Sequence, residues 1–191
     1  MNIKIHYSFV LYIFILFFLG LLKYFFVFFI SIVIHELMHA LVGKILKLKI
    51  IHIKIDICGI SIRFEKLPNN FIERIIIYIA GPLINLIIAI FTYYISRQKY
   101  MFFILSNLVL AIFNMLPIYP LDGGKILYEL VYKFFYNKIL IVRKIYFLLQ
   151  VILLFGLAVF CINYSSIQLF FLGVYFLAFT SENKYKNMEL F

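Results

Sequence analysis

The chain has few cysteines, prolines and acidic residues. It therefore has little material for disulfides or for a metal site built from cysteines. Its 191 residues include two cysteines, four prolines, eight acidic residues and no tryptophan. Cys58 and Cys161 lie far apart and lack the spacing of a cysteine metal site, so we assign them no chemistry. We find no internal repeat and no low-complexity linker. Residues 1–191 are therefore expected to form a single domain.

Apolar residues are abundant along the whole sequence. They make up 66% of the chain and recur in long runs, which is typical of an integral membrane protein. Several apolar stretches follow the first one, which argues against a cleaved secretory signal. With about 20 residues for each span, we predict an all-α polytopic membrane protein. Its six transmembrane helices are expected near 7–22, 24–46, 71–96, 100–119, 141–163 and 166–181. A shorter helix from near Asp122 would continue the fourth span along the interface.

The basic residues indicate the orientation of these spans. With six spans, both termini lie on one side of the membrane, and so do all but three of the 18 Lys and Arg residues, the exceptions being Lys23, Arg97 and Lys99. The positive-inside rule then places both termini in the cytoplasm. The basic residues flank the predicted spans and do not gather on one soluble face. We therefore expect the protein to lie in a lipid bilayer and to bind no nucleic acid.

A cluster of ionisable residues lies inside the second predicted span. His35-Glu36-Leu37-Met38-His39 has apolar neighbours on both sides, where such groups are costly unless they pair, bind a cation or line a cavity. Residues four apart share one helix face, so His35 and His39 can bind one zinc ion. Glu36 lies beside them and can act as the catalytic base. The alternative is that the two histidines only hydrogen-bond between helices.

A catalytic zinc site usually has three protein ligands and one open position. Of the two aspartates, Asp56 lies in an alternating polar stretch, whereas Asp122 follows a predicted span. Both motif-bearing spans run towards the cytoplasm, so His39 and Asp122 are expected at compatible depths. Asp122 is therefore the predicted third ligand, and an ordinary helix cap is its alternative role.

The segment before Asp122 is expected to be unwound. Pro117 and Pro120 would stop an ordinary helix, and Gly123-Gly124 permits close approach of the backbone. Unwound backbone in a membrane needs burial in protein or a wet cavity. A water-filled cleft that opens to the cytoplasm would accommodate this unwound segment.

The stretch 49–65 alternates between apolar and polar residues and changes phase at Cys58-Gly59. A period of two predicts strands, so a short membrane-associated β-hairpin is expected after the second helix. One interpretation is a plain connecting hairpin. The other is a free edge strand that binds substrate in extended form by strand addition. The residues proposed for that contact are Ile51, Ile53, Ile55 and Ile57.

Three motifs together resemble the site-2 proteases, a family of intramembrane zinc metalloproteases. HELMHA at 35–40 is similar to the family's HExxH helix, and NMLPIYPLDGGK at 114–125 is similar to its extended N-x-x-P-x-x-P-x-D-G motif. AGPLIN at 80–85 resembles a third family signature. Within the family, the chain looks most like the stage IV sporulation protein FB group, which processes pro-sigma K at the forespore membrane.

This resemblance implies roles for particular residues. His35, His39 and Asp122 would bind zinc, Glu36 would be the base, and Asn114 would position the substrate or polarise its carbonyl. Pro117, Pro120 and Asn85 are further candidates for contacts with the substrate or the transition state. The alternative for both asparagines is that a buried amide fastens helices together. The CBS domain usual in the sporulation group and the PDZ domain of another branch are absent from this sequence, which weakens the assignment of a substrate.

The predicted activity is hydrolysis of a peptide bond in or near a membrane segment of a protein substrate. That substrate would be a membrane-associated pro-sigma factor or a membrane-anchored anti-sigma factor, in a bacterial inner or forespore membrane. A membrane inhibitor or regulatory partner is compatible with this prediction, and the oligomeric state stays open. The rival functions are a non-catalytic zinc-binding membrane protein and a metal transporter. A transporter would need further ionisable groups across the bilayer, which the fifth and sixth predicted spans lack.

Overall fold

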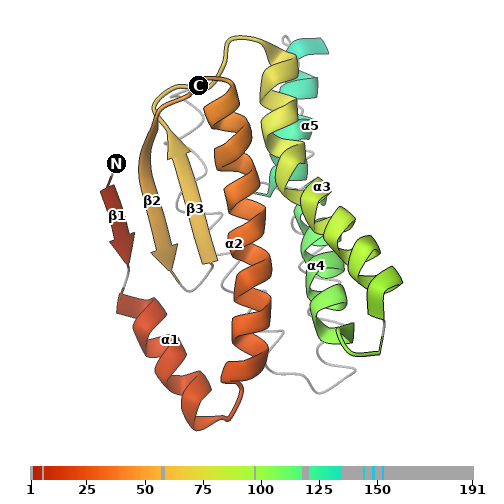
Figure 1. Ribbon diagram of the computed structural model, residues 1–191. Coiled ribbons are helices and arrows are strands. Elements are labelled where there is room, and N and C mark those ends of the chain that lie inside the picture. The colour runs from red at the N-terminus through yellow and green to blue at the C-terminus, as the bar shows by residue number, and fades with distance from the viewer. Residues whose placement is uncertain are drawn as a thin grey trace. The chain divides into compact units, whose positions relative to one another are not determined.

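The computed structural model describes residues 2–5, 7–56, 59–96, 98–117 and 121–134, together with residues 144, 148 and 152. The chain divides into two compact units, Met1–Leu116 and Pro117–Phe191. The first unit contains every strand of the described residues and four of their helices, and Figure 1 labels them. In chain order its elements are β1 (Asn2–Ile5), α1 (Tyr7–Phe18), α2 (Leu22–Ile45), β2 (Ile50–Asp56), β3 (Gly59–Phe64), α3 (Phe71–Ser96) and α4 (Met101–Asn114). The second unit contains α5 (Asp122–Phe134).

The first four predicted spans coincide with helices α1 to α4. Helices α2 and α3 are long and apolar enough to cross a membrane, and α4 is a shorter apolar helix. The spans predicted at 141–163 and 166–181 lie outside the described residues, apart from the helical residues 144, 148 and 152. A total of six spans therefore stays a prediction. The helix expected from Asp122 is confirmed as α5.

Two of these helices end earlier than the sequence predicted. α1 ends at Phe18, and the backbone then turns at Gly20, which has a φ of +68°. Glycine adopts this left-handed conformation without a steric penalty. α4 ends at Asn114 rather than near residue 119, because Pro117 has no N–H to donate and disfavours helical backbone in the residue before it.

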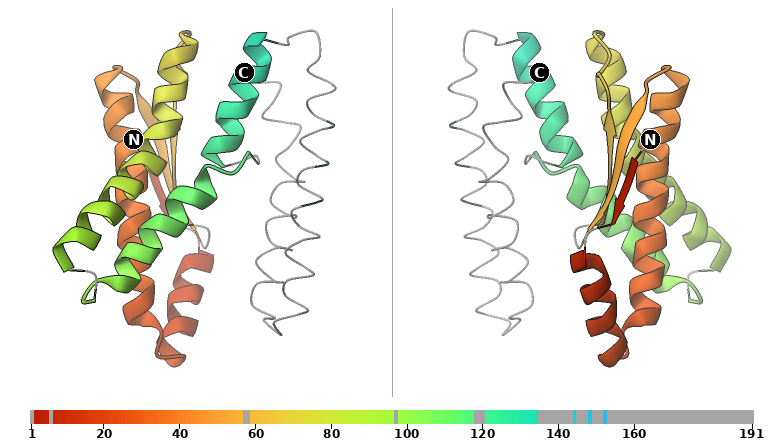
Figure 2. Two further views of the ribbon diagram at one scale, coloured as in Figure 1. Left: turned by 90° about the vertical axis from the view of Figure 1, so that its right-hand side faces the viewer. Right: turned by 90° about the vertical axis from the view of Figure 1, so that its left-hand side faces the viewer.

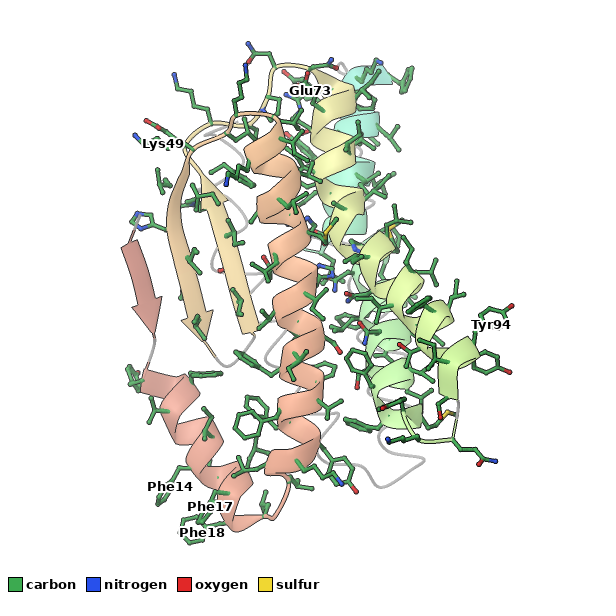
Figure 3. The ribbon with its side chains drawn as sticks, viewed as in Figure 1. Phe14, Phe17, Phe18, Lys49, Glu73 and Tyr94 are labelled. Carbon is green, nitrogen blue, oxygen red and sulfur yellow. The ribbon has the colours of Figure 1, made fainter. Side chains whose placement is uncertain are left out.

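The exposed surface of α1 and α2 is largely apolar. On α2 only 17% of the most apolar window is buried, and Leu37, Leu41 and Ile45 are each at least half exposed. Figure 3 shows Phe14, Phe17 and Phe18 together at the far end of α1, whereas Lys49 and Glu73 lie at the opposite end of this unit. An apolar belt of this kind is unfavourable in water and favourable in lipid hydrocarbon.

The three-stranded sheet includes the predicted hairpin and one strand that the sequence did not reveal. β2 and β3 pair antiparallel, which confirms the hairpin, with an irregularity of register between Ile50 and His52. β1 pairs parallel with β2, so the strand order is β1-β2-β3. The sheet lies beside the C-terminal half of α2, and α1 lies beside its N-terminal half (Figures 1 and 2).

This strand order corrects the prediction of a free edge at residues 51–57. β2 is the central strand, and its backbone is paired on both sides. Ile53 and Ile55 are paired with both neighbouring strands. Ile51 lies at the irregularity of register, outside the residues that β1 pairs with, and Ile57 lies outside the described residues. The prediction failed because β1 has four residues and reaches its partner across the whole of α1 and α2, a parallel pairing that no local pattern reveals.

Helix α3 packs against both α2 and α4 and is bent in its middle (Figure 1). Pro82 lies inside α3, where it removes one backbone hydrogen bond and its ring crowds the preceding turn. The buried residues of α3 cluster around this bend. They include the small residues Ala80, Gly81 and Ala89, which allow close approach of neighbouring helices.

Candidate metal centre and active site

One face of α2 combines small and polar side chains. Ser31, His35, His39 and Gly43 recur every four residues and are all buried. The residues between them include Leu37 and Leu41, which are exposed. Since residues four apart lie one above the other on a helix, the histidines are aligned on the side that α3 and α4 cover.

The two imidazoles present the same ring nitrogen to each other. Nε2 of His35 and Nε2 of His39 lie 3.2 Å apart, and the rings meet edge to face. Two nitrogens that each lie 2.0–2.1 Å from one tetrahedral zinc ion are separated by about 3.3 Å. The spacing of the two Nε2 atoms therefore fits a shared zinc ion.

The other nitrogen of His39 is held by the backbone of α3. His39 Nδ1 lies 2.7 Å from the carbonyl oxygen of Ile77. A carbonyl only accepts hydrogen bonds, so His39 must carry its proton on Nδ1 and present the lone pair of Nε2. This is the tautomer that a metal ligand needs, and backbone carbonyls commonly fix it in this way.

Gly81 of α3 lies directly opposite the two Nε2 atoms. A Cβ atom at this position would contact Nε2 of His39 and would lie 2.6 Å from Nε2 of His35. A methyl group would thus take the place beside both nitrogens that a metal ion requires. The absence of a side chain at Gly81 leaves that place open, which is a second structural feature that fits zinc.

Glu36 follows the first histidine on α2 and is half-buried. Its position in the sequence places it next to the metal-binding face, where a carboxylate can exchange a proton with a water molecule. Asn85 of α3 is fully buried, and its Nδ2 lies 3.3 Å from Nδ1 of His35. Glu36 thus lies on the histidine-bearing α2, and Asn85 lies on α3, which packs against α2.

Asp122 is the first residue of α5 in the second unit. The carboxylate is buried, and Lys125 donates a hydrogen bond of 2.9 Å to its Oδ1. An acidic residue at a helix N-terminus is also favoured by the helix dipole. Like the two histidines, Asp122 is a buried side chain that offers one ligand atom to a metal. A carboxylate with two imidazoles is a set of donors that zinc accepts.

The remaining predicted site residues have different surroundings. Asn114 ends α4 and donates from Nδ2 to the carbonyl of Leu110, one turn earlier on the same helix. Pro117 is exposed in the bend that follows. Pro120 lies outside the described residues. A substrate contact by any of these three stays a prediction.

The sequence did not reveal how α3 completes the histidine site. The Ile77 carbonyl is a backbone atom and leaves no mark in the sequence, and Gly81 was noted only as part of the AGPLIN signature at 80–85. One signal was available. Ile77, Gly81 and Asn85 are spaced by four residues, so they share one face of a helix.

Comparisons with known proteins find peptidases that are similar in sequence and in structure. The model of Peptidase family M50 matches residues 95–159. A zinc metalloprotease of Methanocaldococcus jannaschii is 33% identical over 141 residues, which is 65% of this chain and 41% of that protein. A Synechocystis protein, provisionally named a zinc metalloprotease, is 30% identical over 119 residues, which is 58% of this chain and 31% of that protein. The chain thus spans less than half the length of these two relatives.

A solved structure resembles the fold as well. The site-2 protease from Methanocaldococcus jannaschii has a TM-score of 0.69 and 28% sequence identity. The match covers 90% of this chain and 85% of that one. The chain is thus similar in sequence to peptidases of family M50 and to zinc metalloproteases, and similar in fold to a site-2 protease.

Proposed function

We propose that this protein is an intramembrane zinc endopeptidase that hydrolyses a peptide bond in or near a membrane segment of a protein substrate. The observation that carries this proposal is the histidine pair. Two Nε2 atoms lie 3.2 Å apart on a buried helix face, opposite a glycine that leaves room for a metal. A pair of histidines that only joined helices would not need this open place.

Asp122 is the proposed third ligand. Its carboxylate is buried at the start of α5, and burial of a carboxylate is costly unless a cation or hydrogen bonds compensate it. Lys125 supplies one such bond at Oδ1, and a bound metal ion would compensate the buried charge further. Two imidazoles and one carboxylate leave one position open for water, as a catalytic zinc site requires.

The protein residues have simple tasks in the proposed reaction. When bound, zinc supplies Lewis acidity, which lowers the pKa of water to about 7 and polarises the scissile carbonyl. Glu36 takes the proton from the attacking water and passes it to the leaving nitrogen. The Ile77 carbonyl keeps His39 in one tautomer throughout. No covalent intermediate with the protein is needed.

The substrate is proposed to be a membrane-associated protein. The apolar surface of α2 supports a location in the bilayer, and the positive-inside rule supports cytoplasmic termini and an active site near the cytoplasmic face. Pro-sigma factors and anti-sigma factors are the proposed substrate classes, the first through the resemblance to the sporulation group. Coexpression of the protein with one substrate of each class would show which of them is shortened.

If the substrate adds to the sheet as a strand, it must do so at an outer strand. Of the two outer strands, β3 contacts the histidine-bearing α2, so β3 is the proposed edge. Single proline substitutions at residues 60–63 should then reduce cleavage in protein that still folds. Proline in β2 would break the sheet itself and would not distinguish the two cases. Undiminished cleavage by every folded β3 variant would refute strand addition.

The decisive test of the function compares Glu36→Gln with Glu65→Gln. Glu65 follows β3 and forms an exposed ion pair with Lys49, so its change alters charge equally without touching the histidines. Loss of the catalytic base should reduce cleavage by about 10²–10⁴-fold, with zinc still bound, whereas Glu65→Gln should cleave normally. Full proteolysis by Glu36→Gln would remove Glu36 from its role.

A further inference from the structure

Asn85 of α3 has a buried side-chain amide in which one polar atom lacks a hydrogen-bond partner among the described residues. It is fully buried, and Nδ2 faces Nδ1 of His35 at 3.3 Å. Oδ1 is also buried and has no hydrogen-bond partner among the described residues. Leaving a buried polar group unpaired destabilises the folded protein. The asparagine therefore has an unused acceptor beside a histidine of the candidate metal site.

The chemistry of His35 indicates what that acceptor can do. If His35 binds zinc through Nε2, the ring must carry its proton on Nδ1, which makes Nδ1–H a donor. The Asn85 Nδ2 group is a donor too, so the two cannot bond to each other in that state. A half-turn of the amide about its Cβ–Cγ bond exchanges Nδ2 and Oδ1 at nearly the same positions. Oδ1 then accepts the Nδ1–H bond and is no longer unpaired.

We propose that Asn85 is a positioning residue for zinc, whose amide oxygen accepts Nδ1–H of His35 and thereby fixes Nε2 as the ligating nitrogen. This inference rests on the proposed zinc site. The carbonyl of Ile77 already has the same relation to His39. Both histidines would then be oriented from α3, each through its Nδ1.

The spacing along α3 supports this role. Ile77, Gly81 and Asn85 are four residues apart in turn and are all buried. Along α3, the Ile77 carbonyl and the Asn85 amide are thus two hydrogen-bond acceptors, and the open space at Gly81 lies between them. Gly81 faces the two Nε2 atoms, while the flanking residues lie at the two Nδ1 atoms. Pro82, in the middle of α3, directly follows Gly81.

Asn107 of α4 provides a matched control for Asn85. It is also fully buried, and its Oδ1 also lacks a partner among the described residues. Its Nδ2, however, donates to Ser31 Oγ and to the carbonyl of Phe103, both at 2.9 Å. The two asparagines therefore share burial and chemistry, and only Asn85 contacts a proposed zinc ligand.

The test measures zinc affinity in the purified, detergent-solubilised chain by competition with a chromophoric chelator. Asn85→Leu keeps a similar shape and removes the acceptor, so zinc affinity should fall by about 10–100-fold, the usual effect of losing an outer-shell partner. Asn85→Asp keeps an acceptor and creates a carboxylate–histidine–zinc arrangement, so affinity should stay within about twofold of the wild type. Asn107→Leu should also stay within about twofold. Thermal unfolding of the metal-free variants reports whether each one folds.

Three results would overturn the inference: unchanged affinity in Asn85→Leu, an equal loss in Asn85→Asp, or an equal loss in Asn107→Leu. If Asn85→Leu does not fold, Asn85→Ala replaces it with the same expected loss relative to Asn85→Asp. Failure of the proposed function gives a different result. In that case the wild type would bind no zinc, or the His35→Ala variant would bind zinc as tightly as the wild type. Zinc binding that depends on His35 and ignores Asn85 refutes the inference alone.

Discussion

The two faces of α2 differ in a way that reverses the pattern of a soluble protein. The face towards α3 and α4 carries Ser31, His35 and His39, all buried, whereas Leu37 and Leu41 on the other side are exposed. In water the apolar face would be the buried one. Here the apolar face suits lipid, and the buried face holds the groups that need fixed hydrogen-bond partners.

This difference teaches where a mutation should matter. Lipid is about as apolar as a leucine side chain, so the exposed face gains little from any particular apolar residue. Each polar atom on the buried face has few possible partners, and removal of one cannot be compensated by water. Substitutions on the two faces of α2 should therefore differ sharply in their effects on zinc binding and on stability.

The largest effect is expected for His39→Ala. This change removes a proposed ligand, so zinc affinity should fall by more than the roughly 10–100-fold typical of outer-shell losses. The matched control is His52→Ala, because His52 lies on β2, outside the histidine pair. Zinc content after dialysis, measured by mass spectrometry, checks this prediction. Equal zinc content in both variants would show that the buried face of α2 does not bind the metal.

Gly81→Ala should have the next largest effect. The added Cβ would lie beside Nε2 of both histidines, so zinc affinity should fall by up to about 100-fold, although no ligand is removed. Gly43→Ala is the control, because there the added Cβ meets the ring of Phe64 on β3. That ring can shift, at an overpacking cost of about 1–3 kcal/mol in unfolding free energy, with zinc affinity unchanged. Normal zinc binding by Gly81→Ala would contradict the proposed metal position.

A smaller effect is expected for Ser31→Ala, one turn before His35 on the same face. Asn107 would lose one of its two hydrogen bonds, which should lower the free energy of unfolding by about 0.5–1.5 kcal/mol. Zinc affinity should not change, since the hydrogen bonds of Ser31 join it to Val27 and Asn107 rather than to a histidine. Equilibrium denaturation in mixed micelles measures the first quantity and chelator competition the second. A large loss of zinc would place Ser31 in the metal site.

Leu41→Ala should have the smallest effect. This side chain is half exposed on the apolar face, so the change should alter the free energy of unfolding by no more than about 0.5 kcal/mol. Zinc affinity and cleavage should match the wild type. A strong loss of either would mean that the exposed face of α2 meets a protein partner instead of lipid.

Local features of the fold followed from the sequence. Apolar runs predicted α2 and α3 almost to their ends, and alternation predicted the β2–β3 hairpin. These elements depend on neighbours in the chain, so a short window contains the whole signal. The start of α5 at Asp122 followed equally from the prolines and glycines around it.

Other features depended on residues distant in the chain. The pairing of β1 with β2 joins residues about fifty positions apart, and it removed the open edge expected at β2. The early end of α4 at Asn114 has a local cause that the prediction underused. Pro117 was expected to interrupt the helix, yet the predicted span continued past it to residue 119. The hydrogen bond from His39 to Ile77 uses a backbone carbonyl, which every residue has and no sequence pattern distinguishes.

The sequence by itself determined the histidine pair, because the helical repeat places His35 and His39 on one face with Glu36 beside them, whatever surrounds the helix. Only the tertiary structure decided which ring nitrogens meet and what lies opposite them. The Ile77 carbonyl sets the tautomer of His39, and Gly81 leaves the space beside both Nε2 atoms. The physical reason is that helix geometry acts over four residues, whereas a hydrogen-bond partner and an open space are properties of two helices packed together.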